Sequence, residues 1–174
     1  MPNSRKPVTP PGKPTAPRTT ASERAPLRLE SFLPYRLSIV SNTVSQAIAS
    51  DYQQRFDLSV TEWRVMAVLA RFERISAREV AERTAMDKVA VSRAVARLMV
   101  AGRVHRSVHD NDKRRSVLRL SAAGWLIHDE VAPMARTRER ALLAKLDTEE
   151  RAWLTRILDK LLADDSQPAA PNPT

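Results

Sequence analysis

Apolar residues recur at helical spacing near both ends of the chain. Toward the N-terminus they form one narrow stripe, opposite Ser, Asn and Gln, at Leu33, Leu37, Val40, Val44, Ile48 and Tyr52. Toward the C-terminus, Asp147-Thr148-Glu149-Glu150 has the pattern of an N-cap with a capping box, and an apolar face follows at Trp153, Leu154, Ile157, Leu158, Leu161 and Leu162. Both patterns predict helices. Because a narrow stripe on a long helix is typical of a helix with a partner, we expect both helices to serve dimerisation.

Two further capping boxes mark the middle of the chain. Ser59-x-x-Glu62 and Ser76-x-x-Glu79 predict two helices, the second scarcely three turns long. Asp87 is placed to cap a third helix, and Gly102 to end it in the left-handed conformation. The apolar side of this third helix is formed by Val91, Ala94, Val95 and Leu98.

Two short β-branched and apolar runs follow, residues 103–108 and 116–120, with charged residues 109–115 between them. They predict an antiparallel hairpin with a charged tip. A short capped helix, a tight turn, a second capped helix and a basic hairpin follow one another in the winged helix-turn-helix, whose second helix enters the DNA major groove. The predicted fold over residues 29–163 is therefore mainly α with a small β-hairpin, a winged helix-turn-helix with N- and C-terminal dimerisation helices.

The same patterns predict the organisation of the chain. Residues 29–57 and 122–163 hold the dimerisation helices, and residues 58–121 hold the winged helix-turn-helix. Residues 1–28 contain seven of the twelve prolines and six basic residues against one acidic residue, and residues 164–174 are also rich in proline. Because such segments bury too little apolar surface to offset their ordering entropy, we expect both tails to be disordered.

The charge of the chain indicates a polyanionic partner. Lys and Arg total 29 against 20 Asp and Glu, a formal net charge of +9. Nucleic acid is the typical partner, although a merely basic surface or an acidic membrane face also fits this charge. Three glycines argue against a glycine-rich phosphate loop, zero cysteines exclude thiol chemistry, and no stretch of 18 apolar residues occurs. We therefore expect a cytoplasmic, nucleoid-associated protein with no membrane partner.

The helix after Asp87 carries the residues best suited to read DNA. Its side opposite the apolar face is small or basic, so that it can approach the major groove closely, pair Arg with guanine and place a methyl group on thymine. We assign DNA contacts on this helix, and one at the start of the preceding helix, to Lys88, Val89, Ala90, Ser92, Arg93, Arg97 and Ser76. A solvated basic helix face is the alternative interpretation.

The hairpin tip adds a second candidate DNA contact, formed by Asp112, Lys113, Arg114 and Arg115. Asp112 places a carboxylate beside the guanidinium of Arg114. An Asp that holds an Arg in one rotamer lowers the entropy lost when that Arg enters a minor groove. We therefore predict minor-groove contact by Arg114, and an ordinary charged turn is the alternative.

Six short motifs lie between Thr61 and Gly124, within a stretch of similarity that covers about residues 33–163. They are Thr61-Glu62-Trp63, Val80-Ala81-Glu82, Val91-Ser92-Arg93-Ala94-Val95-Ala96-Arg97-Leu98, Gly102-Arg103-Val104, Asp112-Lys113-Arg114 and Leu118-Arg119-Leu120-Ser121-x-x-Gly124. Together they resemble the MarR family of bacterial transcriptional regulators. The resemblance implies a homodimer on double-stranded DNA at a palindromic operator, read by the helix from Asp87, with Arg114 in the minor groove and Asp112 orienting it. It also implies repression relieved by a small phenol or aromatic carboxylate.

The ligand site that the resemblance implies lies between the dimerisation helices and the DNA-binding lobe. We assign four residues to it: Tyr35, Arg36, Trp63 and Met66. Arg36 is the expected partner of an acid group. The chain departs from the family at Met99 and Val100, where charged residues are usual, and in its basic N-terminal tail, which we expect to add non-specific DNA affinity.

No catalytic residue, metal site or cofactor is predicted. His105 and His109 fall in the wing and His128 after it, without metal-binding geometry, and we expect all three to be exposed or near phosphate. The tryptophans are expected to be core anchors. The predicted function is that of a sequence-specific double-stranded DNA-binding transcriptional regulator, a repressor released by a small aromatic acid or phenolic ligand, and not an enzyme. The alternative is a non-specific architectural DNA-binding or protein-interaction winged-helix module, which would prefer no palindromic site.

Overall fold

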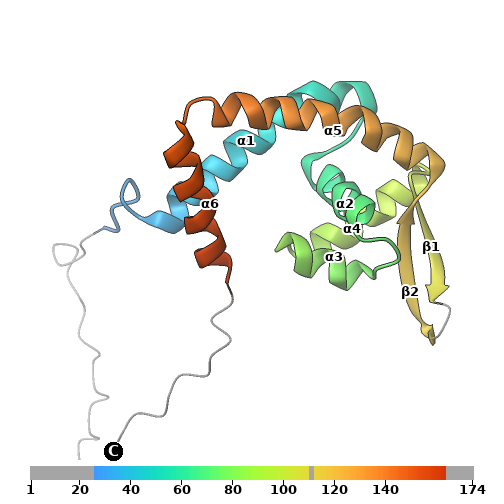
Figure 1. The fold of residues 1–174 in the computed structure, drawn as a ribbon. Helices are drawn as coiled ribbons and strands as arrows, with labels where there is room; N and C mark the ends of the chain where they lie inside the picture. The colour runs from blue at the N-terminus through green and yellow to red at the C-terminus, as the bar shows by residue number, and fades with distance from the viewer. Residues whose placement is uncertain (1–25, 110–111, 164–174) are drawn as a thin grey trace, which may run out of the picture. The chain divides into compact units, whose positions relative to one another are not determined.

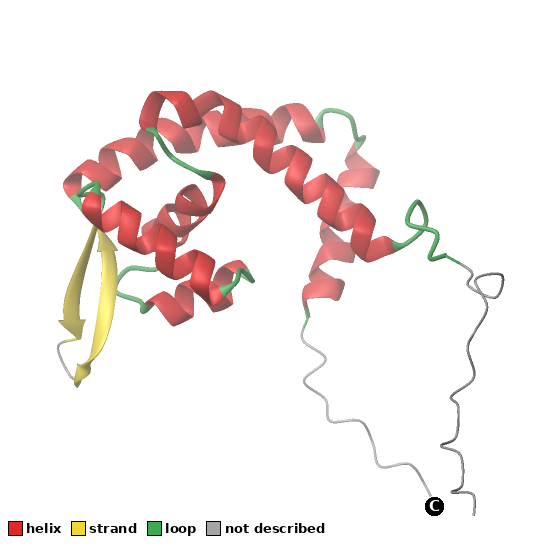
Figure 2. Ribbon diagram, turned by 180° about the vertical axis from the view of Figure 1, so that it is seen from behind, coloured by secondary structure: helices red, strands yellow, loops and turns green. Residues whose placement is uncertain are grey.

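The computed structural model describes residues 26–109 and 112–163, with the backbone alone at 109 and 112–115. Apart from residues 26–28, the predicted tails lie outside this range. Within it, the chain forms six α-helices and a two-stranded antiparallel hairpin (Figure 1; Figure 2), which confirms the predicted fold class. The elements are α1 (Leu33–Phe56), α2 (Val60–Arg71), α3 (Ala77–Thr84), α4 (Lys88–Val100), β1 (Val104–His109), β2 (Asp112–Leu120), α5 (Ala122–Leu143) and α6 (Thr148–Leu162).

The chain divides into two compact units, residues 1–39 and 40–174. The described part of the first unit is a short turn at residues 29–31 and the beginning of α1. All of its described residues are exposed. The buried core, the helix-turn-helix and the hairpin belong to the second unit.

Capping boxes begin α2 and α3 as predicted. The Ser59 amide donates to Glu62 Oε2 (2.8 Å), and the Glu62 amide donates to Ser59 Oγ (3.3 Å). Ser76 and Glu79 make the same reciprocal pair, at 2.8 and 3.2 Å. A third capping box begins α6. These bonds satisfy amides that the first helical turn leaves free, and they fix where each helix starts.

The turn between α3 and α4 is tight because Ala85 adopts the left-handed conformation, with φ of 50°. Asp87 follows as the N-cap of α4, and its Oδ1 accepts from the amides of Val89 and Ala90, both at 2.9 Å. The turn and the cap fix the direction in which α4 leaves α3.

Gly102 ends α4 as predicted, with φ of 68°. Its amide donates to Met99 O (3.0 Å), and the Arg103 amide donates to Leu98 O (2.8 Å), which is the bond pattern of a Schellman motif. Such an ending stops the helix sharply, and the chain enters the hairpin directly from it.

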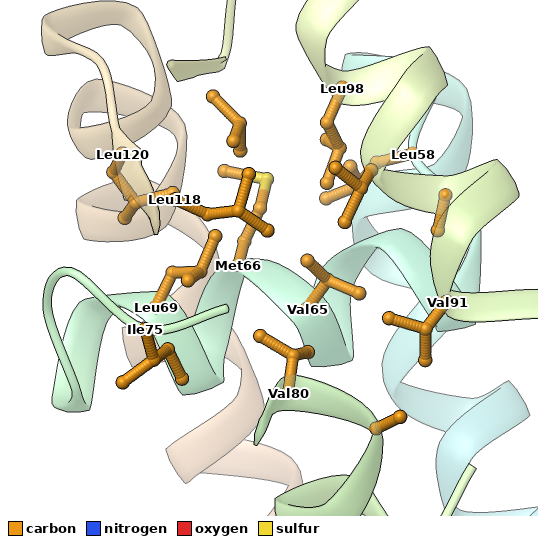
Figure 3. Packing of buried hydrophobic residues seen from close by; sticks show 14 of the residues in the cluster. Leu58, Val65, Met66, Leu69, Ile75, Val80, Val91, Leu98, Leu118 and Leu120 are labelled. Carbon is orange, nitrogen blue, oxygen red and sulfur yellow. The ribbon is translucent and has the colours of Figure 1, made fainter. Parts of the chain in front are cut away.

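Helices α2, α3 and α4 enclose one apolar core with the hairpin and parts of α1 and α5 (Figure 3). Burying each Leu-sized side chain contributes about 1.5–3 kcal/mol. The inner face of α4 is thereby fixed, and its outer face is left to solvent. The large side chains that are fully buried are Tyr52, Leu58, Val65, Met66, Leu69, Val80, Val91, Val95, Leu98, Val104, Leu118 and Val131.

The hairpin is longer than predicted. Its pairs run from Val104 and Leu120 to His109 and Asp112, with a register shift at the outer end. Because β1 ends at His109 and β2 begins at Asp112, the predicted seven-residue charged tip is wrong. A charged run does not by itself mark a turn, because cross-strand register decides where paired strands end. The residues reassigned from the tip to β2 are Asp112, Lys113, Arg114 and Arg115.

Two ion pairs join α1 to α5 within the second unit. Arg138 binds Asp51 through both carboxylate oxygens, at 2.6 and 2.5 Å, and Arg55 pairs with Glu130. The hydrogen bond from Arg138 holds the pKa of the Asp51 carboxyl below its ordinary value, against a smaller opposing effect of burial. The bidentate geometry fixes both side chains as well as their charges.

Helix α6 exposes the apolar face that the sequence predicts. None of its residues is buried. The expectation that Trp153 is a core anchor is wrong for the single chain, because this side chain is 51% exposed and its Nε1 donates to Glu149 at 3.3 Å. None of the described helices has the length and apolar character needed to cross a bilayer.

Candidate nucleic-acid interface

Helix α4 has one buried face and one exposed face. Val91, Ala94, Val95 and Leu98 are buried. Four of the predicted DNA contacts are on the exposed face and present small, apolar or cationic side chains to solvent: Lys88, Val89, Ser92 and Arg93. A helix of this form is able to offer donors and a methyl group to base edges without disturbing its core.

Three predicted contacts are less free than expected. Ala90 is half-buried and its amide is bound by Asp87. The hydroxyl of Ser76 is engaged in its capping box, where it donates to Glu79 at 2.7 Å. Nε of Arg97 is paired with Glu62 at 3.1 Å, although the Arg97 side chain remains 65% exposed. The sequence places all three near the DNA-facing elements, but it does not show these internal bonds.

The wing places further cationic groups next to the helix-turn-helix. Arg106 and Arg119 are exposed on its strands, and Arg119 pairs across the hairpin with His105, which is also exposed. The side chains of residues 112–115 lie outside what the structure describes. The minor-groove role of Arg114 and its orientation by Asp112 therefore remain predictions.

The four predicted ligand residues fall in both units. Tyr35 and Arg36 belong to the first unit and are exposed. Trp63 is half-buried in the second unit, and Met66 is fully buried in its core (Figure 3). Met66 therefore packs against core side chains and offers no exposed surface to the predicted ligand, and its place in the ligand site stays a prediction. Its position on the inner face of α2 accounts for the difference.

An aromatic cluster joins α1, α2 and α5. Trp63 contacts Tyr52 with ring centroids 5.9 Å apart and stacks on His128 at 5.8 Å, and Trp125 meets the edge of His128 at 5.3 Å. The expectation that His128 is exposed or near phosphate is wrong, because its side chain is only 20% exposed and lies between two indoles. The i, i+3 spacing of Trp125 and His128 is the signal that places them on one helix face.

The Tyr52 hydroxyl is buried with no hydrogen-bond partner among the residues that the structure describes. Burial raises the pKa of Tyr52 to about 12, against a smaller lowering effect of the Arg64 charge. A buried hydroxyl without a partner is costly, so this position is a weak point in the core.

Across residues 26–109 and 112–163, no group of three or more His, Cys, Asp or Glu side chains is arranged to hold a metal ion. The chemistry that the described surface offers is that of cationic and small side chains on α4 and of cationic side chains on the hairpin. Groups of these kinds contact phosphate oxygens and base edges in DNA-binding proteins.

Comparisons with known proteins agree with this geometry. The model of the MarR family matches residues 56–115. The chain is similar to a MarR/EmrR family transcriptional regulator from Acinetobacter sp. ADP1, with 26% identity and a TM-score of 0.71 over 78% of this chain and 95% of that one. No curated protein matches the sequence.

Two other solved structures share the fold. One is BpsR of Bordetella bronchiseptica, whose DNA binding is regulated by 6-hydroxynicotinic acid, with 19% identity and a TM-score of 0.70 over 81% of this chain and 100% of that one. The other is a mutant of Escherichia coli MarR complexed with operator DNA, with 24% identity and a TM-score of 0.67 over 79% and 99%. In its helix-turn-helix and wing, and in these likenesses, the chain is similar to members of the MarR family.

Proposed function

We propose that the chain is a transcriptional regulator that binds double-stranded DNA in the cytoplasm at a palindromic operator. The observation that carries the proposal is the exposed face of α4. Lys88, Val89, Ser92 and Arg93 lie on this face, and the opposite face of the helix is buried in the core. In this proposal α4 enters the major groove and the wing follows the backbone into the minor groove. Residues 58–121 form the DNA-binding lobe.

The proposed regulator acts as a homodimer, with residues 29–57 and 122–163 as the dimerisation region. Support comes from the exposed apolar face of α6, with Leu154, Ile157, Leu158 and Leu161. Each such side chain gains about 1.5–3 kcal/mol when it is buried, so a second copy is the natural cover. A two-fold dimer also matches a palindromic operator, because each of its two identical DNA-binding lobes contacts one of two identical half-sites.

The proposed regulator is a repressor released by a small aromatic acid or phenol. Support comes from the fold shared with BpsR, which responds to a hydroxylated aromatic acid. Among the residues assigned to this ligand, Arg36 is an exposed cation and Tyr35 and Trp63 supply aromatic surface. Such groups suit a carboxylate attached to a ring.

Selection of bound fragments from the protein's own genome tests the proposal. The full chain is mixed with sheared genomic DNA at one fixed salt concentration, and the retained fragments are sequenced. We expect one palindromic consensus, bound several orders of magnitude more tightly than bulk DNA. Retention of all fragments alike would instead support a non-specific architectural module. Addition of 6-hydroxynicotinic acid and related aromatic acids then tests whether a ligand releases the selected duplex.

A further inference from the structure

Arg97 lies on the exposed face of α4, yet its guanidinium is bound within the protein. Its Nε forms an ion pair with Glu62 Oε1 at 3.1 Å, while Glu62 Oε2 accepts from the amide of Ser59 at 2.8 Å and from its hydroxyl at 2.5 Å. Glu62 is only 6% exposed and is the one charged residue that is buried among those the structure describes. A buried carboxylate is costly unless its oxygens are hydrogen-bonded and paired, so Arg97 supplies the counter-ion that Glu62 needs.

We propose that the Glu62–Arg97 pair is a positioning device, which holds the C-terminal half of α4 on the corner between α1 and α2, and that Arg97 does not read base sequence. The inference rests on the proposed function, because it assigns a role within the same DNA-binding surface. Arg97 is thereby reassigned from a residue that contacts bases to a residue that positions the recognition helix α4.

The two halves of α4 are held differently. The N-terminal half is fixed by the left-handed turn at Ala85 and by the Asp87 cap. Beside the C-terminal half, an open cavity of about 390 Å³ lies between the corner and the last turns of the helix, with Ala96 and Val100 in its wall. Apolar packing of Val95 and Leu98 holds the inner side of this half, but it does not fill the cavity on its outer side. The Glu62–Arg97 pair crosses it from corner to helix.

A second cation strengthens the same corner. Arg103, just after α4, donates through Nη2 to Phe56 O at 2.5 Å and through Nη1 to Asp57 O at 3.1 Å. This pair of bonds fixes the entry to the wing. Leu98 and Arg103 still hold the end of α4 when the Glu62–Arg97 pair is lost, so the outer side of the helix would be loosened without being detached. We therefore expect binding to every DNA sequence to weaken by a similar factor.

The sharpest test is Glu62→Gln, because electrostatics and positioning predict opposite effects. Removing an acid beside a DNA-binding helix raises affinity through charge alone. Loss of positioning lowers it, and we expect roughly tenfold weaker binding when the ion pair of the buried carboxylate is lost. Gln at this position keeps the capping box with Ser59, so the start of α2 is preserved. Glu150→Gln, the same change in the capping box of α6, is the matched control and should bind as the parent does.

The measurement is the Kd of the full chain for the duplex that the parent selects from a random library, and for every single-base variant of it, at one salt concentration. Glu62→Gln and Arg97→Met should both weaken binding to all duplexes by a common factor and leave the order of base preference unchanged. The double variant should bind no worse than the weaker single variant, since the two side chains act as one unit. Arg93→Ala, in contrast, should change the preference at one position.

Two results would overturn the inference. One is an altered base preference in Arg97→Met, and the other is affinity of folded Glu62→Gln equal to or above that of the parent. If either single variant fails to fold, the double variant is measured instead, because it leaves no unpaired buried charge. Weaker binding by the double variant with the base preference of the parent supports the inference. A changed base preference, or an affinity equal to that of the parent, contradicts it. A parent that selects no duplex contradicts the proposed function as well, whereas a selective parent with an unaffected Glu62→Gln variant contradicts this inference alone.

Discussion

A Cβ atom at position 124 would lie 2.1 Å from the carbonyl oxygen of Arg103, so only glycine fits where α5 begins. The same oxygen accepts a hydrogen bond from the Ser121 amide at 3.0 Å, and Ser121 Oγ accepts one from the Gly124 amide at 3.0 Å. The first turn of α5 is thus seated directly on the backbone that leaves α4.

Gly124→Ala should destabilise the protein by about 3 kcal/mol, because a backbone carbonyl cannot move aside as a flexible side chain does. Urea unfolding followed by circular dichroism measures the change. Gly102→Ala is the matched control: its φ of 68° is strained for alanine, but nothing lies within 4 Å of the added Cβ. It should cost about 1 kcal/mol. Equal losses for both variants would contradict a steric role for position 124.

Ala85→Gly should stabilise the protein by about 0.5–1 kcal/mol. Ala85 has φ of 50°, a conformation that costs a residue with a Cβ about 1–2 kcal/mol, partly offset by the greater freedom of glycine in the unfolded chain. Ala96→Gly, on the exposed face of α4, should have the opposite sign and cost about 1 kcal/mol. Thermal unfolding of the two variants compares them, and a loss of stability in Ala85→Gly would show that the left-handed turn is not strained.

Tyr52→Phe should raise stability at neutral pH by about 1 kcal/mol, because it removes a buried hydroxyl that has no partner among the described residues. It should also change how the stability of the protein depends on pH in the alkaline range. Burial raises the pKa of Tyr52 from 10.0 to about 12, so the unfolded chain loses this proton first as the pH rises. The free energy of unfolding of the parent is therefore unaffected by this proton below pH 10 and falls as the pH rises from 10 to 12. Urea midpoints across this range should therefore decline more steeply for the parent than for Tyr52→Phe.

Asp51→Asn should lose stability at neutral pH and little in acid. Its hydrogen bond from Arg138 lowers the pKa of Asp51 below 3.8, so the unfolded chain takes up this proton first as the pH falls. The contribution of the pair is present above pH 3.8 and disappears below the lowered value. Parent and variant should differ in melting temperature at pH 7 and converge in acid. A constant difference across the whole range would show that the charge of Asp51 is not what stabilises the α1–α5 contact.

Arg93 and Arg114 should differ in what they recognise. Arg93→Ala should cost about 1–3 kcal/mol at the preferred site and relax the preference at one position in each half-site. Arg114→Ala should weaken binding most where the flanks of the site are A·T-rich. Asp112→Ala should have the same effect to a smaller extent. Half-sites about 10 base pairs apart are expected for a two-fold dimer. Gel shifts on duplexes with varied flanks measure these effects, and parental binding of every duplex by Arg114→Ala would exclude the wing from DNA recognition.

The sequence predicts the helix-turn-helix well because its limits are set by local chemistry. Ser59, Ser76 and Asp87 cap helices, and Gly102 ends one, through bonds to residues two to four positions away. Such contacts are visible in a linear pattern. The length of the hairpin is harder to predict from the sequence, because cross-strand register decides it. A run of charged residues is compatible with a turn and with the end of a strand.

Tertiary contacts account for the site residues that the sequence misplaces. Arg97 is bound to Glu62, 35 positions earlier, and His128 stacks on Trp63, 65 positions earlier, so neither pairing leaves a local signal. Met66 and Trp153 are both apolar residues on predicted helices. Their burial is opposite because α2 faces the core of its own chain, whereas no residue of α6 is buried.

Arg103 has a consequence beyond its part at the start of the wing. Its amide completes the end of α4, its carbonyl oxygen seats the first turn of α5, and its guanidinium binds the carbonyl oxygens that end α1. One residue therefore connects α4, which we propose reads DNA, with the wing and with α1 and α5. We expect a rotation of α5 or a shift of the end of α1 to be transmitted directly to α4, because no series of flexible side-chain contacts lies between them to absorb the movement.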